Sequence, residues 1–199
     1  MIYIFDELEK VDDEYLKNCE GSLSQERRDK ILRLKTPGAK IQSAIAYMLL
    51  RYALHCEYNI DEAVLFEYNH KGKPALKDYP HIHISLSHCK TAAACALSES
   101  EIGVDIQDIR PVTDRLLRRV LTENEYIKCK NSASPKEYFC RAWTIKESII
   151  KKTGQGIGET LFKINSENIK DVTIYRGNNY YCCVTEVNMK EEKISIGAL

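Results

Sequence analysis

Glu147 and Lys151 lie four residues apart in the segment WTIKESIIKK and could do chemistry together. The apolar residues of this segment recur at helical spacing, and side chains at positions i and i+4 of a helix are neighbours about 6 Å apart. A carboxylate can ligate a hard cation or accept a proton, and an ammonium can neutralise a phosphate. The simpler interpretation is a solvated salt bridge on the helix surface. Lys146 falls inside the apolar arc, so we expect it to have a structural partner.

A further carboxylate, that of Asp105, lies in the apolar segment IGVDIQD. Strand alternation places Asp105 and Gln107 on one face, and Gly103 admits a close approach by backbone or ligand. With Glu147, these side chains could supply oxygen ligands to magnesium, which prefers one or two carboxylates together with water and substrate phosphates. Taken alone, Asp105 is better explained as an aspartate that flanks a turn.

Candidate anion-binding residues precede that strand. The turn NHKGKP presents Lys71 and Lys73, and Ser87 and His88 end the segment HIHISLSH. Backbone N–H groups, ammonium groups, a hydroxyl and an imidazole can all bind an anion. The turn lacks the spacing of a P-loop, and on its own it indicates a surface turn. The basic run 27–30 likewise indicates a solvated helix face.

The remaining segments must position these groups, and their patterns predict a mixture of helices and strands. Strands are predicted at residues 1–5, 64–68, 81–89, 91–97, 101–109, 171–175, 180–187 and 192–199. Ser24 is placed to cap a helix that ends near Leu34, and Pro37 to begin a long core-packed helix.

Two S/T-x-x-E patterns predict capping boxes, one of Thr122 with Glu125 and one of Ser134 with Glu137. The second, with Pro135 at the first helical position, would open the helix that contains WTIKESIIKK. The order of elements is strand, helices and strands, then helices and strands again. This order indicates an α+β protein of two halves that meet near residue 100.

Composition narrows the function classes. The 199 residues include 29 Lys and Arg and 29 Asp and Glu, so no global basic field attracts nucleic acid or an anionic membrane. No apolar run approaches the ~18 residues that cross a bilayer, and the N-terminus has no signal-peptide pattern. The eight cysteines show no C-x-x-C spacing, which favours reduced thiols, several of them in the core, and a cytoplasmic protein.

Taken in order, GKP, SLSH, IGVDI and FCRAWTIKESIIKKTGQG resemble the motifs of the 4′-phosphopantetheinyl transferases of the Sfp type. The family pattern is a strand with Gly-Ile/Val-Asp, followed further along the chain by a helix with Trp-Ser/Thr-x-Lys-Glu-Ala/Ser-x-x-Lys. Residues 103–105 match the first part and residues 143–151 match the second. Gly154 and Gly156 match the glycines at the helix exit, where Gly158 also lies. The match is anchored in residues 72–156.

The resemblance implies an α+β fold of two α/β halves related by a pseudo-two-fold axis. Residues 1–100 would contact the nucleotide of coenzyme A, residues 101–199 would supply the metal ligands and catalytic residues, and the active site would lie between them. The implied reaction is the magnesium-dependent transfer of the 4′-phosphopantetheine arm of coenzyme A to a serine hydroxyl of an apo acyl or peptidyl carrier protein, with release of 3′,5′-ADP. Since one chain supplies both sides of the site, we expect a monomer.

Residue roles follow from the same matched positions. Glu147 would accept the proton of the carrier serine, and Lys151 would bind the pyrophosphate and neutralise the departing ADP. The magnesium ligands implied by the resemblance are Asp105, Gln107 and Glu147. The implied contacts to coenzyme A are Lys30, Lys73, Pro74, Ser87, His88 and Lys151, with Lys73 and Pro74 beside the adenine and Ser87 and His88 near the 3′-phosphate.

Two departures from the family pattern matter. Gln107 stands where many members have a carboxylate, and an amide is a poorer ligand for a hard cation. No arginine for the 3′-phosphate aligns in the first half, so Lys30 or Lys40 is expected in that role. Gln107 is also the one feature that favours an alternative, a coenzyme A-binding module that docks carrier proteins without transfer. Fatty-acid, polyketide and nonribosomal peptide carriers stay open as partners.

Overall fold

The computed structural model describes residues 1–155 and 161–199. The α-helices are α1 (Asp13–Cys19), α2 (Gln25–Leu32), α3 (Pro37–Tyr58), α4 (Asp114–Val120), α5 (Glu123–Asn131) and α6 (Pro135–Thr153). The strands are β1 (Ile2–Phe5), β2 (Phe66–Tyr68), β3 (Pro74–Leu76), β4 (His83–His88), β5 (Ala93–Ser98), β6 (Val104–Asp108), β7 (Thr173–Arg176), β8 (Tyr180–Val184) and β9 (Glu191–Lys193). The expected α+β fold class is confirmed.

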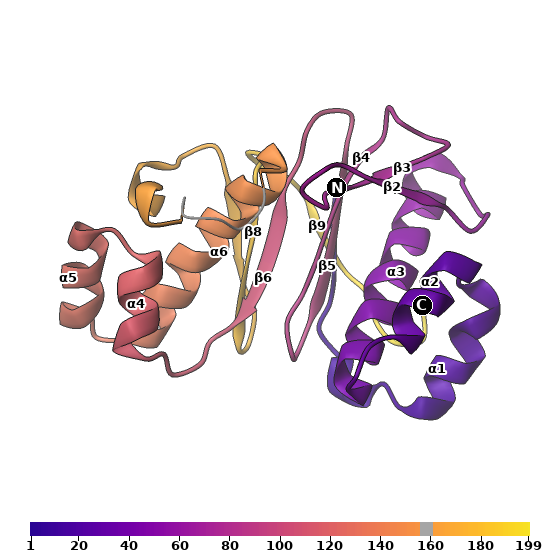
Figure 1. Ribbon diagram of the computed structural model, residues 1–199, viewed down its shortest axis with the longest axis horizontal. Coiled ribbons are helices and arrows are strands. Elements are labelled where there is room, and N and C mark those ends of the chain that lie inside the picture. Colours follow the sequence, from indigo (N-terminus) through magenta and orange to yellow (C-terminus); the bar gives the residue numbers. More distant parts are fainter. Residues whose placement is uncertain (156–160) are drawn as a thin grey trace.

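Two sheets lie side by side in the middle of the molecule, with helices on both outer sides (Figure 1). One sheet has the strand order β4-β5-β1-β9 and is covered by α3, and the other has the order β6-β8-β7 and is covered by α6. The strands β2 and β3 form a separate hairpin. Each half therefore pairs a sheet with one long helix, as the resemblance implies.

The strand β1 shows why both faces of the first sheet are buried. Tyr3 and Phe5 pack in the cluster that includes α3, whereas Ile2 and Ile4 pack against the second sheet. Side chains of a strand alternate between its faces, so one short apolar segment serves both cores. Ala94 of β5 lies in the cluster between the sheets, where a small side chain allows a close approach.

The N-terminal caps of the helices follow the predicted chemistry with one exception. Ser24 Oγ accepts from the amide of Arg27 at the start of α2, and Thr122 with Glu125 forms a reciprocal capping box on α5. The predicted box at Ser134 is wrong, because Ser134 makes no side-chain cap bond. Its expected partner Glu137 instead accepts from the guanidinium of Arg176 at 3.0 Å.

The strand β9 joins the first sheet although it comes from the end of the chain. It pairs in parallel with β1, with Ile4 opposite Lys193. The sequence pattern placed this strand at residues 192–199, later than its observed bounds, and the division at residue 100 assigned it to the second half. The division of the chain into residues 1–100 and 101–199 stays a prediction. The structure shows that one strand of the second range, β9, joins the sheet formed by strands of the first range.

Gly103 allows α6 to lie directly on the start of β6. A Cβ atom at this position would come within 2.0 Å of the carbonyl oxygen of Ser148 and 2.4 Å of the amide of Lys152. The close approach expected at this glycine is therefore made by the backbone of α6. It sets the distance between the strand that carries Asp105 and the helix that carries Glu147.

We expect Gly103→Ala to lower the free energy of unfolding by about 1–3 kcal/mol, because backbone atoms rather than flexible side-chain ends would have to move. Urea denaturation checks this value, and Gly38→Ala on the first turn of α3, where nothing lies within 4 Å of an added Cβ, is the matched control. Equal stabilities of the two variants would contradict the close packing.

The cysteines agree with a further expectation, that of reduced thiols located mostly in the core. All eight cysteines are free, and all except Cys56 are buried. Within residues 1–155 and 161–199, none of the helices combines the length and the apolar character needed to cross a membrane.

Candidate active site

The side chains of Asp105 and Gln107 lie on the same side of β6, as the strand pattern predicted. Gln107 Nε2 donates to Asp105 Oδ2 at 3.1 Å. Asp105 is only 2% exposed, and its other oxygen, Oδ1, accepts from Lys151 Nζ of α6 at 2.8 Å. The strand therefore presents an aspartate to the helix, and the interpretation of Asp105 as a turn-flanking residue is wrong.

Glu147 is buried beside this pair and carries an oxygen without a partner. The residue is 3% exposed, and Oε1 has no hydrogen-bond partner among the described residues. Burial, and after it the negative charge of Asp105, raise the pKa of Glu147 to about 7, whereas Lys151 opposes the shift. The interpretation of Glu147 and Lys151 as a solvated surface pair is therefore wrong.

Lys146 has the structural partner that its place in the apolar arc predicted. Its ammonium is fully buried and donates to Glu125 Oε2 at 2.6 Å and to the carbonyl of Val120 at 2.7 Å. Glu125 also accepts from the amide and the hydroxyl of Ser166. Lys146 thus links α6 to α5 through Glu125, and Glu125 links α5 to the segment around residue 166.

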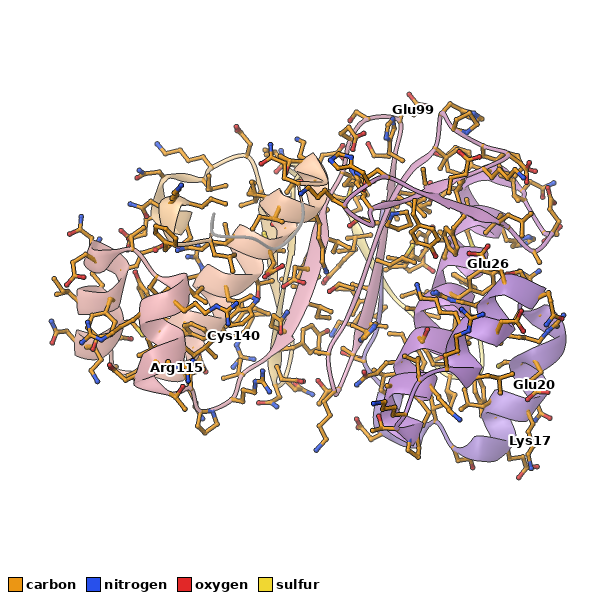
Figure 2. The ribbon with its side chains drawn as sticks, viewed as in Figure 1. Lys17, Glu20, Glu26, Glu99, Arg115 and Cys140 are labelled. Carbon is orange, nitrogen blue, oxygen red and sulfur yellow. The ribbon has the colours of Figure 1, made fainter. Side chains whose placement is uncertain are left out.

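The face of α6 that carries Glu147 is also attached to β6 through a cysteine. Figure 2 shows Cys140 on α6, and its Sγ donates to the carbonyl of Gln107 at 3.2 Å. Together with the close contact of Gly103 with Ser148 and Lys152, this bond aligns residues 140–152 of the helix along the strand. Glu147 and Lys151 therefore lie beside Asp105, the second residue of β6.

Lys151 also contacts the first half of the chain. Its ammonium donates to Ser87 Oγ of β4 at 2.7 Å, and Ser87 Oγ in turn donates to Asp105 Oδ1 at 2.9 Å. Ser87 is buried. The site is therefore built from both halves, with the hydroxyl from one half placed between a carboxylate and an ammonium from the other.

Two adjoining pockets lead away from this cluster. The Lys151 pocket, of about 340 Å³, lies between the NHKGKP turn and the C-terminal end of α6 and is lined by residues that include Lys71, Lys73 and Lys151. The Arg27 pocket, of about 290 Å³, is lined by residues that include Arg27, Lys30 and His88. The two pockets share the lining residues Gly72, Pro74 and Leu86.

Arg27 is a site residue that the sequence analysis missed. It is 7% exposed, and its guanidinium lies over the rings of Tyr47 and Phe66, 5.2 Å and 5.6 Å from their centroids. Its Nε is buried without a hydrogen-bond partner in the described part of the chain, and burial lowers its pKa. A buried cation beside a pocket is a ready site for an anion.

The run 27–30 was interpreted as a solvated helix face, and this is wrong for Arg27. The helix α2 that carries it, marked in Figure 2 by Glu26, turns one side to the hairpin of β2 and β3. Tyr68 of that hairpin has Lys30 over its ring. The signal available in the sequence was the helical spacing of Arg27 and Lys30, three residues apart on one face.

The other predicted coenzyme A contacts fall in different places. Pro74 lines both pockets, His88 lines the Arg27 pocket, and Ser87 is not among the residues that line it. Lys73 lines the Lys151 pocket, but its ammonium is paired with Glu101 and donates to the carbonyl of Lys152 at 2.7 Å. Lys40 does not line the Arg27 pocket, whereas Lys30 does.

The NHKGKP turn is attached to the exit of α6. Gly154 ends the helix in the left-handed conformation, with φ of 64°, and its carbonyl accepts from Asn69 Nδ2 at 3.3 Å. A Cβ atom at Gly154 would meet the side chains of Asn69 and Lys73. Gly156 and Gly158, which the sequence pattern places in the same exit, lie outside the described residues.

The donor set of the cluster fits a hard cation that keeps part of its hydration shell. It offers the carboxylates of Asp105 and Glu147, one oxygen of which is unpartnered, and the amide of Gln107. Within the described residues no three His, Cys, Asp or Glu side chains form a closed metal cage. Magnesium typically takes one or two carboxylates and completes its shell with water and phosphates, so an open site of this kind suits it.

Comparison with known proteins places the matched motifs in one family. Residues 101–192 match the model of the 4′-phosphopantetheinyl transferase superfamily. A 4′-phosphopantetheinyl transferase of Aneurinibacillus migulanus is 32% identical over 165 residues, which cover 79% of this chain and 68% of that protein. One of Bacillus subtilis is 27% identical over 181 residues, covering 88% of this chain and 81% of the relative. The match to Sfp of Bacillus subtilis (strain 168), at 28% identity, covers 68% of this chain and 62% of Sfp, just under two thirds.

Proposed function

This chain belongs to the family of 4′-phosphopantetheinyl transferases, and we propose that it transfers the 4′-phosphopantetheine arm of coenzyme A to a serine hydroxyl of an apo acyl or peptidyl carrier protein. In this reaction the serine oxygen forms a bond to the β-phosphorus of coenzyme A. The bond from that phosphorus to the bridging oxygen breaks, and the oxygen leaves with 3′,5′-ADP. The observation that carries the proposal is the pair of adjoining pockets with cations along both, next to two buried carboxylates.

Glu147 is the group best placed to take the proton of the carrier serine. Its pKa of about 7 leaves a substantial fraction ionised near neutral pH, which is the range in which a general base is most effective. Its buried oxygen without a partner is free to accept a hydrogen bond, directly or through one water molecule. The pKa shift and the free oxygen have the same cause, namely the burial of the side chain between β6 and α6.

Lys151 supplies positive charge where negative charge collects on the leaving group. Phosphoryl transfer depends mainly on positioning and on charge neutralisation, since the protein has little covalent chemistry to do. The ammonium lies at the wall of the Lys151 pocket and is about a quarter exposed, so an incoming phosphate can reach it.

Magnesium would be held by Asp105 and Glu147, with the amide oxygen of Gln107 or a water molecule beside them. When bound, it supplies positive charge that offsets the repulsion between the phosphates and the carboxylates. Two buried carboxylates near each other, of which one has a raised pKa, are the residues that such a cation would stabilise.

The Arg27 pocket suits the 3′-phosphate of coenzyme A. Arg27, Lys30 and His88 line it, and none of the described residues that line it is a carboxylate. The carboxylate charge that acts on Arg27 and Lys30 is that of Glu26, which is exposed and lies outside this lining, so these cations remain available to an anionic ligand. Arg27 therefore takes the role that the sequence analysis assigned to Lys30 or Lys40, with Lys30 beside it.

Arg27→Met is expected to weaken the binding of coenzyme A by about 10–100-fold, because charge-assisted hydrogen bonds to a phosphate are lost. The binding of dephospho-coenzyme A, which has no 3′-phosphate, should change by much less. Isothermal titration of both ligands measures the two constants. Arg28→Met, on the same helix with the same change in charge, is the control and should leave both unchanged. Equal losses for the two ligands would count against this assignment.

The reaction itself is tested by weighing a carrier. Purified protein, coenzyme A, magnesium and an apo carrier domain are mixed, and the mass of the carrier is measured. A gain of one phosphopantetheine group is expected on at least one acyl or peptidyl carrier. No gain on any of several carriers, together with intact coenzyme A binding, would favour the alternative of a binding module without transfer. We further propose that the protein acts as a monomer, since both sides of the site come from one chain, and that it is cytoplasmic, in keeping with its eight free cysteines.

A further inference from the structure

The two halves of the site are joined at a seam between strands β4 and β6, which belong to different sheets. The amide of Val104 donates to Ser85 Oγ at 2.9 Å, and the amide of Ile106 donates to Ser87 Oγ at 3.2 Å. The two serines are two residues apart on one face of β4, and the two amides are two residues apart on β6. Serine hydroxyls therefore accept the bonds that carbonyl groups of a neighbouring strand accept in an ordinary sheet.

Among the contacts of the described residues, charged groups of the site are reached by the second of these serines and not by the first. Ser87 Oγ donates its hydrogen to Asp105 Oδ1 at 2.9 Å and accepts from Lys151 Nζ at 2.7 Å. Together with the amide of Ile106, these contacts use its one donor and both acceptor positions. Ser87 is 6% exposed, so water does not compete for these bonds.

Asp105 is held from two sides as a result. Oδ1 accepts from Ser87, and Oδ2 accepts from Gln107 Nε2 at 3.1 Å. A carboxylate that binds a hard cation must be oriented by the groups behind it, and loss of such a partner typically weakens metal binding by about 10–100-fold. Ser87 is the orienting group that comes from the other half of the chain.

We propose that Ser87 is a positioning residue: its hydroxyl, from the N-terminal half, fixes the Asp105 carboxylate and the Lys151 ammonium of the C-terminal half relative to each other, and it does not bind the 3′-phosphate. This assignment rests on the proposed function. It differs from the role that the family resemblance implies for Ser87. The geometry supports it, because the hydroxyl is saturated by contacts inside the protein and Ser87 does not line the Arg27 pocket.

The test compares Ser87→Ala with Ser85→Ala. Each variant removes one hydroxyl that accepts one amide of β6, and Ser87→Ala also removes the contacts to Asp105 and Lys151, so it should lose more stability in thermal unfolding. Binding is therefore compared at a temperature at which thermal unfolding shows both variants folded. Mn²⁺, an oxygen-preferring probe of the cation site, is titrated by electron paramagnetic resonance without a carrier. The affinities for 3′,5′-ADP and for 5′-AMP, which lacks the 3′-phosphate, are measured separately and without metal. The ratio of the two affinities reports the contact with the 3′-phosphate alone, because both nucleotides carry the 5′-phosphate that is proposed to meet Lys151.

We expect Ser87→Ala to weaken Mn²⁺ binding about tenfold or more and Ser85→Ala to leave it within about twofold. Both variants should prefer 3′,5′-ADP to 5′-AMP by the same factor as the wild type. Equal effects of the two variants on Mn²⁺ binding would overturn the proposal and leave Ser87 as a seam residue only. A loss of the preference for 3′,5′-ADP in Ser87→Ala alone would overturn it in favour of a direct contact with the 3′-phosphate.

The outcome of this test of Ser87 can be distinguished from the outcome of the carrier assay that tests the proposed function. Absence of saturable Mn²⁺ binding to the wild type would overturn the positioning role, whatever the carrier assay shows. A wild type that binds Mn²⁺ and 3′,5′-ADP but adds no mass to any carrier would instead contradict the transferase activity.

Discussion

Glu147→Gln is expected to lower the rate of transfer by about 10²–10⁴-fold, the usual contribution of a positioned general base. Glutamine has almost the same shape as glutamate, so the variant should keep the packing of α6 on β6. It removes the charge that we propose accepts the serine proton and one of the two carboxylates proposed to hold magnesium. The mass assay on a carrier, run as a time course, measures the loss.

The same substitution should stabilise the ligand-free protein at alkaline pH. Burial and the charge of Asp105 raise the pKa of Glu147 from 4.5 to about 7 in the folded chain. A carboxyl with a raised pKa in the folded state contributes stability that is fully present below about pH 4.5 and is lost as the pH rises through about 7. At about pH 8 the wild type has to bury a carboxylate, which lowers its free energy of unfolding by about 3 kcal/mol.

Urea unfolding without magnesium at about pH 4.5 and about pH 8 checks the sign. The stability advantage of Glu147→Gln over the wild type should be small at the lower pH and approach about 3 kcal/mol at the higher one. Glu99→Gln, in the exposed loop labelled in Figure 2, is the matched control and should show no such pH dependence. An equal advantage at both pH values would show that the Glu147 carboxylate is not desolvated in solution.

The second large effect concerns the buried pair of Lys146 and Glu125. Lys146→Met should lower the free energy of unfolding by about 3–5 kcal/mol, because it leaves the Glu125 carboxylate buried without its cation. Glu125 would keep its bonds from Ser166 and Thr122, but these do not neutralise its charge. Burial opposes ionisation of both partners, which is why removing one of them is so costly.

Denaturation in urea measures this loss, and the double variant Glu125→Gln/Lys146→Met should recover a large part of it, since neither charge then remains. The control is Lys128→Met, which breaks the exposed pair of Lys128 with Glu167 and should cost less than about 1 kcal/mol. A small loss in Lys146→Met would mean that water reaches Glu125. Lys146 and Glu147 are neighbours in α6, but only Glu147 is proposed to take part in the reaction. Comparing Lys146→Met with Glu147→Gln therefore separates the contribution of α6 to stability from its contribution to the reaction.

Most helices and strands could be predicted because their signals are local. The start of a helix is marked by a capping hydrogen bond at Ser24 and Thr122 and by the fixed backbone angle of proline at Pro37. Each of these signals involves only a few neighbouring residues. The Ser134 box failed for a tertiary reason: Glu137 is bonded to Arg176 and Tyr181, which lie about forty residues away in the chain. The strand β9 was misplaced because its bounds depend on pairing with β1, and its own residues show little alternation.

The residues of the candidate site likewise fall into those that the sequence identified and those whose surroundings only the structure revealed. Asp105, Glu147 and Lys151 were identified from the residues and from the family motif, and the structure brings them together. Arg27 was missed because its neighbours in sequence are charged, and its burial comes from packing on Tyr47 and Phe66. Lys73 was identified, but a local pattern could not show that Glu101 pairs with its ammonium.

By itself, the sequence determined the family, the helix that carries Glu147 and Lys151 in one row, and the strand that presents Asp105. These features depend on residue types at short spacings, which backbone geometry converts directly into positions on one face. The tertiary structure alone decided which partner each charge has. Lys151 meets Ser87 and Asp105 across 64 and 46 residues of sequence, and Lys146 meets Glu125 across 21. The first two contacts depend on how the two sheets and α6 pack, and the third depends on how α5 packs on α6. The packing of α6 on β6 also buries Glu147 and so raises its pKa.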